Sequence, residues 1–116
     1  MASSELGVPL TPDDVCRIGS VTKQFVAAAL LHRVDAGAMS LADPLSKFLT
    51  DFPNGTNITV AQLPNHTSGV KSYTGIPGYM DGPIRQDLCT AELVAVFRDK
   101  PVDFIPGLAF AYNNSG

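Results

Sequence analysis

Tryptophan is absent from this sequence of 116 residues, which contains only two histidines and two cysteines. Charged residues make up 16% of the chain and the formal net charge is -3, so no basic patch is available to bind a nucleic-acid backbone. The longest apolar run, residues 25–31, is much shorter than the roughly 18 residues that a membrane-spanning helix needs. The first residues also lack the charged start and apolar stretch of a signal peptide.

The two cysteines, Cys16 and Cys89, lie far apart and form no C-x-x-C pair, so we expect neither a zinc site nor another cofactor. We expect both to be buried free thiols, with a disulfide between them as the alternative. Free thiols favour a reducing compartment and therefore slightly favour the cytoplasm. Hydrophobic residues make up 45% of the chain, which is typical of a globular protein, and residues 1–116 are expected to form a single domain.

The strongest helical pattern covers residues 21–36, which are rich in alanine and leucine. Ser20 can cap the start of this helix, and Gly37 ends it. Because residues 25–31 are apolar on nearly all sides, we expect the helix to lie in the middle of a core.

Three shorter helices and almost no strand are predicted after this one, so the expected class is mainly α. Each short helix has a recognisable start or stop signal. The first begins at Asp43, with Pro44 at the first helical position. The second begins at a capping box from Thr59 to Gln62, and Pro64 should distort it or end it early. The third follows Thr90 and covers residues 91–99.

Ser20 and Lys23 form an S-x-x-K step at the start of the strongest helix. This spacing places a hydroxyl and an amine one turn apart on the same face, where the amine can take the serine proton. The backbone N–H groups at a helix start can also stabilise an oxyanion. The pattern therefore suits acyl transfer through a serine ester. The structural alternative is a capping serine and a solvated lysine.

Two further segments carry chemically capable side chains. In residues 112–114 (Tyr-Asn-Asn), the phenol can accept a proton if a lysine stabilises its phenolate, and an amide can hold a substrate carbonyl. The alternative is a core-covering tyrosine followed by a turn. In residues 65–69 (Asn-His-Thr-Ser-Gly), His66 could act as a base for Ser68, although a tight turn with Gly69 at positive φ explains the pattern better. A second S-x-x-K step, from Ser68 to Lys71, contains that glycine and is not expected to be helical.

These motifs occur together in a recognisable order and spacing. They are residues 16–23 (Cys-Arg-Ile-Gly-Ser-Val-Thr-Lys), residues 65–69, the Pro-Gly step at 106–107, and residues 110–116 (Phe-Ala-Tyr-Asn-Asn-Ser-Gly). In this combination the chain closely resembles the class C β-lactamase family, which includes penicillin-binding proteins, D-alanyl-D-alanine carboxypeptidases and serine esterases. The resemblance covers the chain from about residue 9 onward.

The resemblance implies a function and a role for each site residue. Ser20 would be the acylated nucleophile, Lys23 would relay its proton, Tyr112 would be the general base and later the acid, and Asn114 would contact the substrate amide. The substrate would be a small ester, amide or β-lactam, and the loop at 65–69 would be structural. The fold would be the helical lobe and nucleophile helix of a β-lactamase/transpeptidase-like α+β fold.

Most of the sheet of that fold is missing from this chain, as is the family's third motif, a Lys-Thr-Gly or His-x-Gly step on a strand. We therefore expect the chain to represent part of a longer domain. The alternative function is a catalytically incomplete lobe that binds a partner or self-associates through its apolar helix.

Overall fold

The computed structural model describes residues 3–116. Within them the chain forms two α-helices, α1 (Thr22–Asp35) and α2 (Thr90–Phe97), and its only strand-like pairings are two isolated bridges. The expectation of a mainly α unit is confirmed. Single 3-10 turns make up the remaining regular structure: η1 (Gly19–Val21), η2 (Leu45–Lys47), η3 (Val60–Gln62), η4 (Tyr73–Gly75), η5 (Tyr79–Asp81) and η6 (Pro83–Arg85).

Helix α1 confirms the strongest sequence prediction, with bounds one residue inside the expected 21–36 at each end. Its end is closed as the glycine predicted, because Gly37 has φ 70° and its N–H donates to the Val34 carbonyl at 2.9 Å. Its start differs from the prediction. Ser20 lies in η1, and no side-chain cap bonds the first turn of α1. The Ser20 hydroxyl is thus not engaged as a helix cap.

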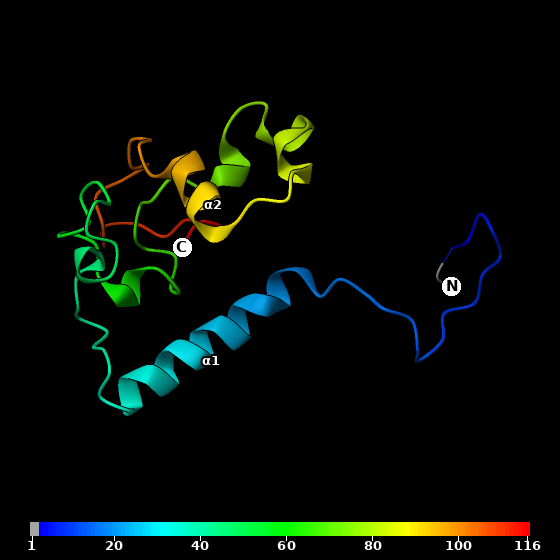
Figure 1. The fold of residues 1–116 in the computed structure, drawn as a ribbon, viewed down its shortest axis with the longest axis horizontal. Helices are drawn as coiled ribbons and strands as arrows, with labels where there is room; N and C mark the ends of the chain where they lie inside the picture. Colours follow the sequence, from blue (N-terminus) through cyan, green and yellow to red (C-terminus); the bar gives the residue numbers. More distant parts are fainter. Residues whose placement is uncertain (1–2) are drawn as a thin grey trace.

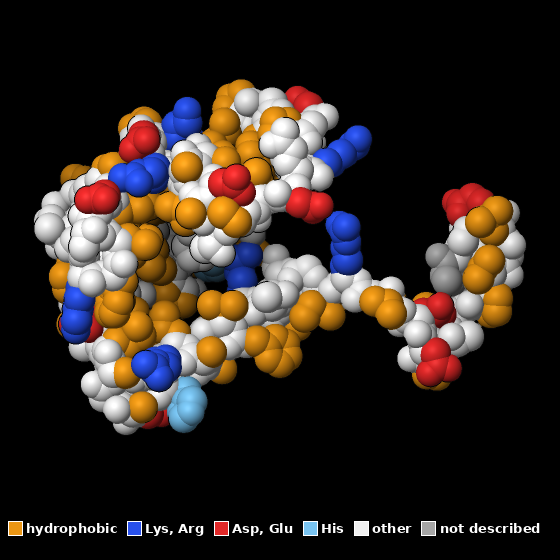
Figure 2. Space-filling view, in the orientation of Figure 1, with side chains coloured by type: hydrophobic (Ala, Val, Ile, Leu, Met, Phe, Trp, Pro, Cys, Tyr) orange, Lys and Arg blue, Asp and Glu red, His pale blue; other side chains and the backbone are white. Residues whose placement is uncertain are grey.

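The predicted central position of α1 is wrong for this chain. None of its residues is buried, and Phe25 and Val26 are 66% and 60% exposed. Figure 1 shows α1 along one side of the molecule, and Figure 2 shows hydrophobic side chains along its outer edge. The apolar composition of α1 indicates a surface that favours burial, but whether that surface is buried depends on other segments that pack against it.

The shorter helices begin close to their predicted positions, but two caps differ. In η2 the N-cap is Pro44, and the Asp43 carboxylate accepts hydrogen bonds from the Ser40 N–H at 2.8 Å and the Lys47 ammonium at 2.7 Å. In α2 the N-cap is Cys89 rather than the predicted Thr90. Helix α2 ends at Phe97, so the predicted helix over residues 91–99 starts one residue too late and ends two residues too late.

The capping box at Thr59 is present as predicted. The Thr59 N–H donates to the Gln62 side chain at 3.0 Å, and the Thr59 hydroxyl bonds the backbone in return. Element η3 is a single turn that ends two residues before Pro64, in agreement with the early stop that proline imposes.

Both cysteines are free thiols, and both are exposed, so the expectation of buried thiols is wrong. Cys89 stands at the start of α2, where its N–H donates to the Glu92 carboxylate at 2.8 Å. Cys16 belongs to the segment that extends away from the rest of the chain before α1 (Figure 1). Among residues 3–116 no helix has the length and apolar character to span a membrane.

The hydrophobic core is small and lies between α2 and the loops around it. Ile58 is fully buried at its centre, and Phe97 anchors α2 to it. The radius of gyration is 17.2 Å, whereas about 13 Å is typical of a compact chain of this length. The projecting N-terminal segment and the peripheral α1 account for the difference (Figure 1). The other members of the core are Leu45 and Val70, with Phe52, Leu63, Tyr73, Ile76 and Val94 packed against them.

Two segments far apart in sequence run beside one another and determine where the last residues lie. The loop at 66–69 bonds the segment at 103–111 through three backbone hydrogen bonds of 2.8 to 3.0 Å. Gly69 has φ 71° as predicted, and its Cα faces the Phe104 backbone so closely that a Cβ would not fit. This pairing positions residues 112–114 beside the start of α1.

Candidate active site

Ser20 and Lys23 lie on consecutive turns at the start of α1. Ser20 belongs to η1, and Lys23 is the second residue of α1, so their spacing places both on one face. Ser20 is exposed, whereas Lys23 is half-buried. The N–H groups of Val21 and Thr22 donate to carbonyls in and just before η1, so the backbone donor nearest the Ser20 hydroxyl that could serve a ligand is the N–H of Ser20 itself.

Tyr112 meets Ser20 from the other end of the chain. Its hydroxyl donates a hydrogen bond to Ser20 Oγ at 2.5 Å, across 92 positions of sequence. A phenol at this distance can take the serine proton directly once it is ionised. Tyr112 remains 53% exposed, so the pair opens to solvent and to ligands.

Lys23 contacts Asn114 and Tyr112. Its ammonium donates to Asn114 Oδ1 at 2.7 Å and lies 4.9 Å from the centroid of the Tyr112 ring. The structure therefore brings together the four residues that the sequence singled out, Ser20, Lys23, Tyr112 and Asn114. It joins them in two pairs, with Ser20 bonded to Tyr112 and Lys23 bonded to Asn114.

The surroundings of Tyr112 favour its ionised form. The hydrogen bond with Ser20, followed by the polar interaction with Lys23, lowers the pKa of the Tyr112 phenol below its ordinary value; desolvation opposes this shift, and the positive charge of Lys23 adds to it. Once the phenol has lost its proton, the Ser20 hydroxyl can donate back to the phenolate oxygen. A lowered pKa supplies more phenolate near neutral pH than an isolated tyrosine has.

Two neighbours hold the Tyr112 backbone in place. The adjacent Asn113 is buried, and its side chain donates to the Val70 carbonyl at 2.5 Å while its Oδ1 accepts the Ser115 N–H at 2.6 Å. His66 Nδ1 accepts the Asn113 N–H at 3.2 Å, and the imidazole lies 4.8 Å from the Tyr112 ring. The histidine is therefore engaged with the Tyr112 segment.

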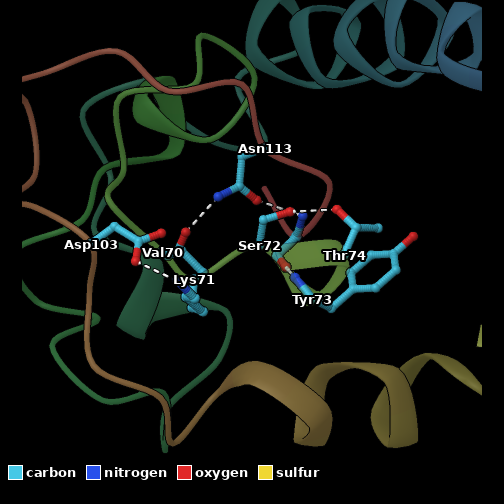
Figure 3. Close-up of polar contacts among 8 residues, drawn as sticks. Val70, Lys71, Ser72, Tyr73, Thr74, Asp103 and Asn113 are labelled. Atoms are coloured by element: carbon cyan, nitrogen blue, oxygen red, sulfur yellow. Dashed lines mark hydrogen bonds and ion pairs between the residues drawn. The ribbon is translucent and has the colours of Figure 1, made fainter. Parts of the chain in front are cut away.

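The other candidate serine is structural. Ser68 is only 1% exposed, and its Oγ accepts the Val70 N–H at 3.3 Å, whereas His66 bonds Asn113 instead. Lys71, from the second S-x-x-K step, forms an ion pair with Asp103 at 2.8 Å. Figure 3 shows this ion pair and the bond between Asn113 and Val70 on opposite sides of the same loop. The loop at 65–69 thus has the structural role that the sequence favoured.

The sequence interpretation missed the turn that contacts Asn114. Asn114 Nδ2 donates to Thr74 Oγ1 at 3.0 Å, and its backbone N–H donates to Ser72 Oγ at 3.2 Å. The two hydroxyls lie 3.0 Å apart (Figure 3). Only their nearness to the conspicuous loop at 65–69 could have drawn attention to them, because serine and threonine are common in turns.

The described residues form no cluster of three or more histidine, cysteine, aspartate or glutamate side chains.

Comparison with known proteins assigns the family. The profile of the family described as Beta-lactamase matches residues 1–116, which is the full sequence. The chain belongs to the β-lactamase family. The resemblance identified from the motifs is therefore confirmed.

Relatives of this β-lactamase-family chain have several activities in their names. It is 30% identical to Esterase EstB of Burkholderia gladioli over 127 residues, which cover 97% of the chain and 32% of the esterase. It is 33% identical to Penicillin-binding protein 4 of Amycolatopsis lactamdurans, covering 95% of the chain and 29% of that protein. Members of the family named esterase and penicillin-binding protein thus match nearly all of the chain.

Solved structures support the same assignment. The D-stereospecific amidohydrolase from Streptomyces sp. superposes with a TM-score of 0.78 at 36% identity, covering 90% of this chain and 35% of that one. The D-amino acid amidase of Ochrobactrum anthropi superposes with a TM-score of 0.81 at 26% identity, covering 96% and 32%. The chain thus has part of the family fold, and it spans about a third of the length of the relatives that it matches.

The lowered pKa of Tyr112 gives a direct prediction for this β-lactamase-family site. Replacing Lys23 by methionine removes the neighbouring positive charge, so the pKa of Tyr112 should rise and its phenolate should appear only at higher pH. The titration of Tyr112 can be followed by NMR of tyrosine labelled at Cζ, with Tyr112→Phe to assign the signal.

Lys47→Met is the matched control, because Lys47 pairs with Asp43 on the surface and also lies near an aromatic ring, that of Phe48. It removes the same charge far from Ser20 and should leave the Tyr112 titration unchanged. A Tyr112 titration that is identical in wild type and Lys23→Met would contradict the electrostatic account.

Proposed function

We propose that the chain carries the nucleophile half of a serine hydrolase site that transfers an acyl group from an amide, ester or β-lactam to Ser20. The observation that supports this most directly is the 2.5 Å contact between the Tyr112 hydroxyl and Ser20 Oγ. Capping or core covering does not require this contact, whereas nucleophile activation does.

The proposed reaction uses these groups in order. The Tyr112 phenolate removes the Ser20 proton as Oγ attacks the substrate carbonyl carbon and the carbonyl electrons move to oxygen. The tetrahedral intermediate then collapses, the bond to the leaving group breaks, and Tyr112 returns the proton to the leaving amine or alcohol. In the second half, Tyr112 takes a proton from water and the hydroxide attacks the acyl carbon of the Ser20 ester. The bond from that carbon to Oγ then breaks, Tyr112 returns the proton to Oγ, and the acyl group leaves as the acid.

The remaining residues support these steps. The Lys23 ammonium stabilises the negative phenolate, and the backbone N–H of Ser20 can donate to the developing oxyanion. Asn114 holds Lys23 and keeps one amide hydrogen of Nδ2 for a substrate carbonyl, because only one is used by Thr74. No cofactor is used in this mechanism.

The substrate class follows from the acyl chemistry and from the relatives. The names of matching proteins include an esterase, a penicillin-binding protein and a D-stereospecific amidohydrolase. All three descriptions are compatible with attack by an activated serine on an acyl carbon. A small molecule with an activated ester, a strained lactam or an amide of a D-amino acid is the proposed substrate.

Covalent labelling of the 116-residue chain tests the proposal. We expect incubation with a fluorescent penicillin, or with an activated short-chain ester, to increase the intact mass by one acyl group. Peptide mapping should place the adduct on Ser20. A folded protein that forms no adduct with either reagent, or one labelled elsewhere, contradicts the proposal.

A second candidate, self-association, is favoured by the exposure of α1. Phe25 and Val26 lie uncovered on this helix, and exposed apolar surface of this kind is often an interaction site. In this function the chain would pair with a second copy and would have no turnover. Measurement of the molecular mass in solution separates the two candidates, because a monomer that is labelled on Ser20 supports only the first.

A further inference from the structure

The Asn114 carboxamide is held at both ends. Its Oδ1 accepts from the Lys23 ammonium at 2.7 Å, and its Nδ2 donates to Thr74 Oγ1 at 3.0 Å. The Asn114 backbone N–H donates to Ser72 Oγ at 3.2 Å. Three polar groups of one residue are therefore fixed by a lysine on one side and by one serine–threonine pair on the other.

The chemistry of these partners determines which way the amide points. An ammonium group only donates hydrogen bonds, so the carbonyl oxygen of Asn114 must face Lys23. The amide nitrogen then faces Thr74, whose hydroxyl oxygen can accept from it. Ser72 and Thr74 also bond one another at 3.0 Å (Figure 3), which restricts the rotation of both hydroxyls.

The turn that carries these hydroxyls is itself tied to the segment beyond Asn114. The Tyr73 N–H, between the two hydroxyl residues, donates to Ser115 Oγ at 2.9 Å. Ser72, Tyr73 and Thr74 thus contact both Asn114 and the residue after it. All three residues of the turn are half-buried, which favours a fixed geometry.

We propose that Ser72 and Thr74 are positioning residues that orient Asn114 so that it holds the Lys23 ammonium beside Tyr112. The role of this pair in a reaction rests on the function proposed above, whereas its effect on Lys23 does not. Neither residue touches the reacting groups. They act through Asn114, and Asn114 acts through Lys23.

The physical need for such a device comes from the lysine side chain. Lysine has a flexible four-carbon stem and loses considerable rotamer entropy when it is fixed. A single acceptor that could itself rotate would define the ammonium position poorly. With Thr74 bonded to Nδ2, rotation of the Asn114 amide breaks a hydrogen bond, so the acceptor for Lys23 stays in place.

The test compares Thr74→Val with Thr74→Ser. Valine keeps the shape of threonine without the hydroxyl, whereas serine keeps the hydroxyl. We expect Thr74→Val to raise the titration midpoint of the Tyr112 phenol part of the way toward that of Lys23→Met, and Thr74→Ser to stay near wild type. Acylation of Ser20 in Thr74→Val should be about tenfold slower, as expected for loss of one hydrogen bond, and should recover as the pH rises.

Two further variants keep the result interpretable. Ser72→Ala removes the hydroxyl that accepts the Asn114 N–H and should move the Tyr112 titration in the same direction. Thr56→Val makes the same chemical change as Thr74→Val at an exposed loop position and should leave the titration unchanged. Far-ultraviolet circular dichroism checks that each variant is folded.

The outcomes separate this proposal from the proposed function. If wild type forms no acyl adduct but Thr74→Val still raises the Tyr112 midpoint, the positioning role stands and the hydrolase proposal fails. If Lys23→Met raises the midpoint while folded Thr74→Val and Ser72→Ala match wild type, the positioning role is overturned. Equal shifts in Thr74→Val and Thr74→Ser also overturn it, because the hydroxyl would then not be the cause.

Discussion

Replacing Ser20 by alanine is expected to abolish acyl-adduct formation completely. The hydroxyl oxygen is the one protein atom that bonds the acyl carbon in the proposed reaction, and Tyr112 donates its hydrogen bond to that same atom. Loss of a nucleophile that works together with a base removes nearly all of the covalent chemistry, on the order of a thousandfold or more in rate. Intact-mass analysis after incubation with the penicillin and ester reagents measures this loss.

The matched control is Ser4→Ala, which removes a hydroxyl from the exposed segment before α1. It should be labelled as fast as wild type. If Ser20→Ala formed as much adduct as wild type, the reactive group would be a residue other than Ser20. Since Ser20 forms no capping bond, the substitution is expected to leave the stability of α1 nearly unchanged, and circular dichroism can verify this.

Replacing Gly69 by alanine is expected to cause a large loss of stability. Gly69 has φ 71°, a conformation that costs an alanine about 1 kcal/mol, and it is buried against the Phe104 backbone. A methyl group there would meet the Phe104 carbonyl oxygen far inside van der Waals contact, which adds about 2 kcal/mol. Urea unfolding followed by circular dichroism should therefore show a loss of about 3 kcal/mol.

Gly78→Ala is the control that separates backbone strain from the clash. Gly78 also has a positive φ, 76°, but nothing lies within 4 Å of the position that a Cβ would occupy. Its substitution should therefore cost only about 1 kcal/mol. Equal losses at the two glycines would show that the contact with Phe104 is not responsible. Because Gly69 also joins the segment that leads to Tyr112, its alanine variant should label Ser20 more slowly as well.

The local parts of the fold were predictable because they depend on neighbours in sequence. Alanine-rich residues before Gly37 predicted α1, and the Thr59 capping box and Pro64 predicted the start and the early end of η3. The predicted N-caps of η2 and α2 were each wrong by one residue, because Pro44 rather than Asp43 takes that position in η2. At α2, Cys89 took the position expected for Thr90.

Burial was predicted less well because it depends on distant segments. The apolar composition of α1 predicted a central helix, but in this chain its surroundings leave Phe25 and Val26 exposed. The cysteines were expected inside on the basis of average behaviour, and both lie outside. Periodicity and composition describe a preference for burial, whereas the fold decides whether a partner is present.

One part of the candidate site, the pair of Ser20 and Lys23, was predictable from the sequence, whereas the contact of Tyr112 with Ser20 was not. The spacing of Ser20 and Lys23 follows from helix geometry alone. The residues around Tyr112 in the sequence gave no reason to place it beside Ser20. Only the resemblance to the family implied that the two side chains are in contact. The contacts of Ser72 and Thr74 with Asn114 were not predicted, because these hydroxyls come near the site only when the fold brings Asn114 beside them.

The separation of 92 positions between Tyr112 and Ser20 has a consequence for how reactivity arises during synthesis and folding. Closing so long a loop is entropically costly, and in the folded chain it goes together with the docking of residues 103–111 against the loop at 66–69. Until that docking is complete, Ser20 is an ordinary alcohol on a helix end. On the proposed mechanism, a nascent chain therefore carries Ser20 in an unreactive form at least until Tyr112 has been synthesised and can reach it.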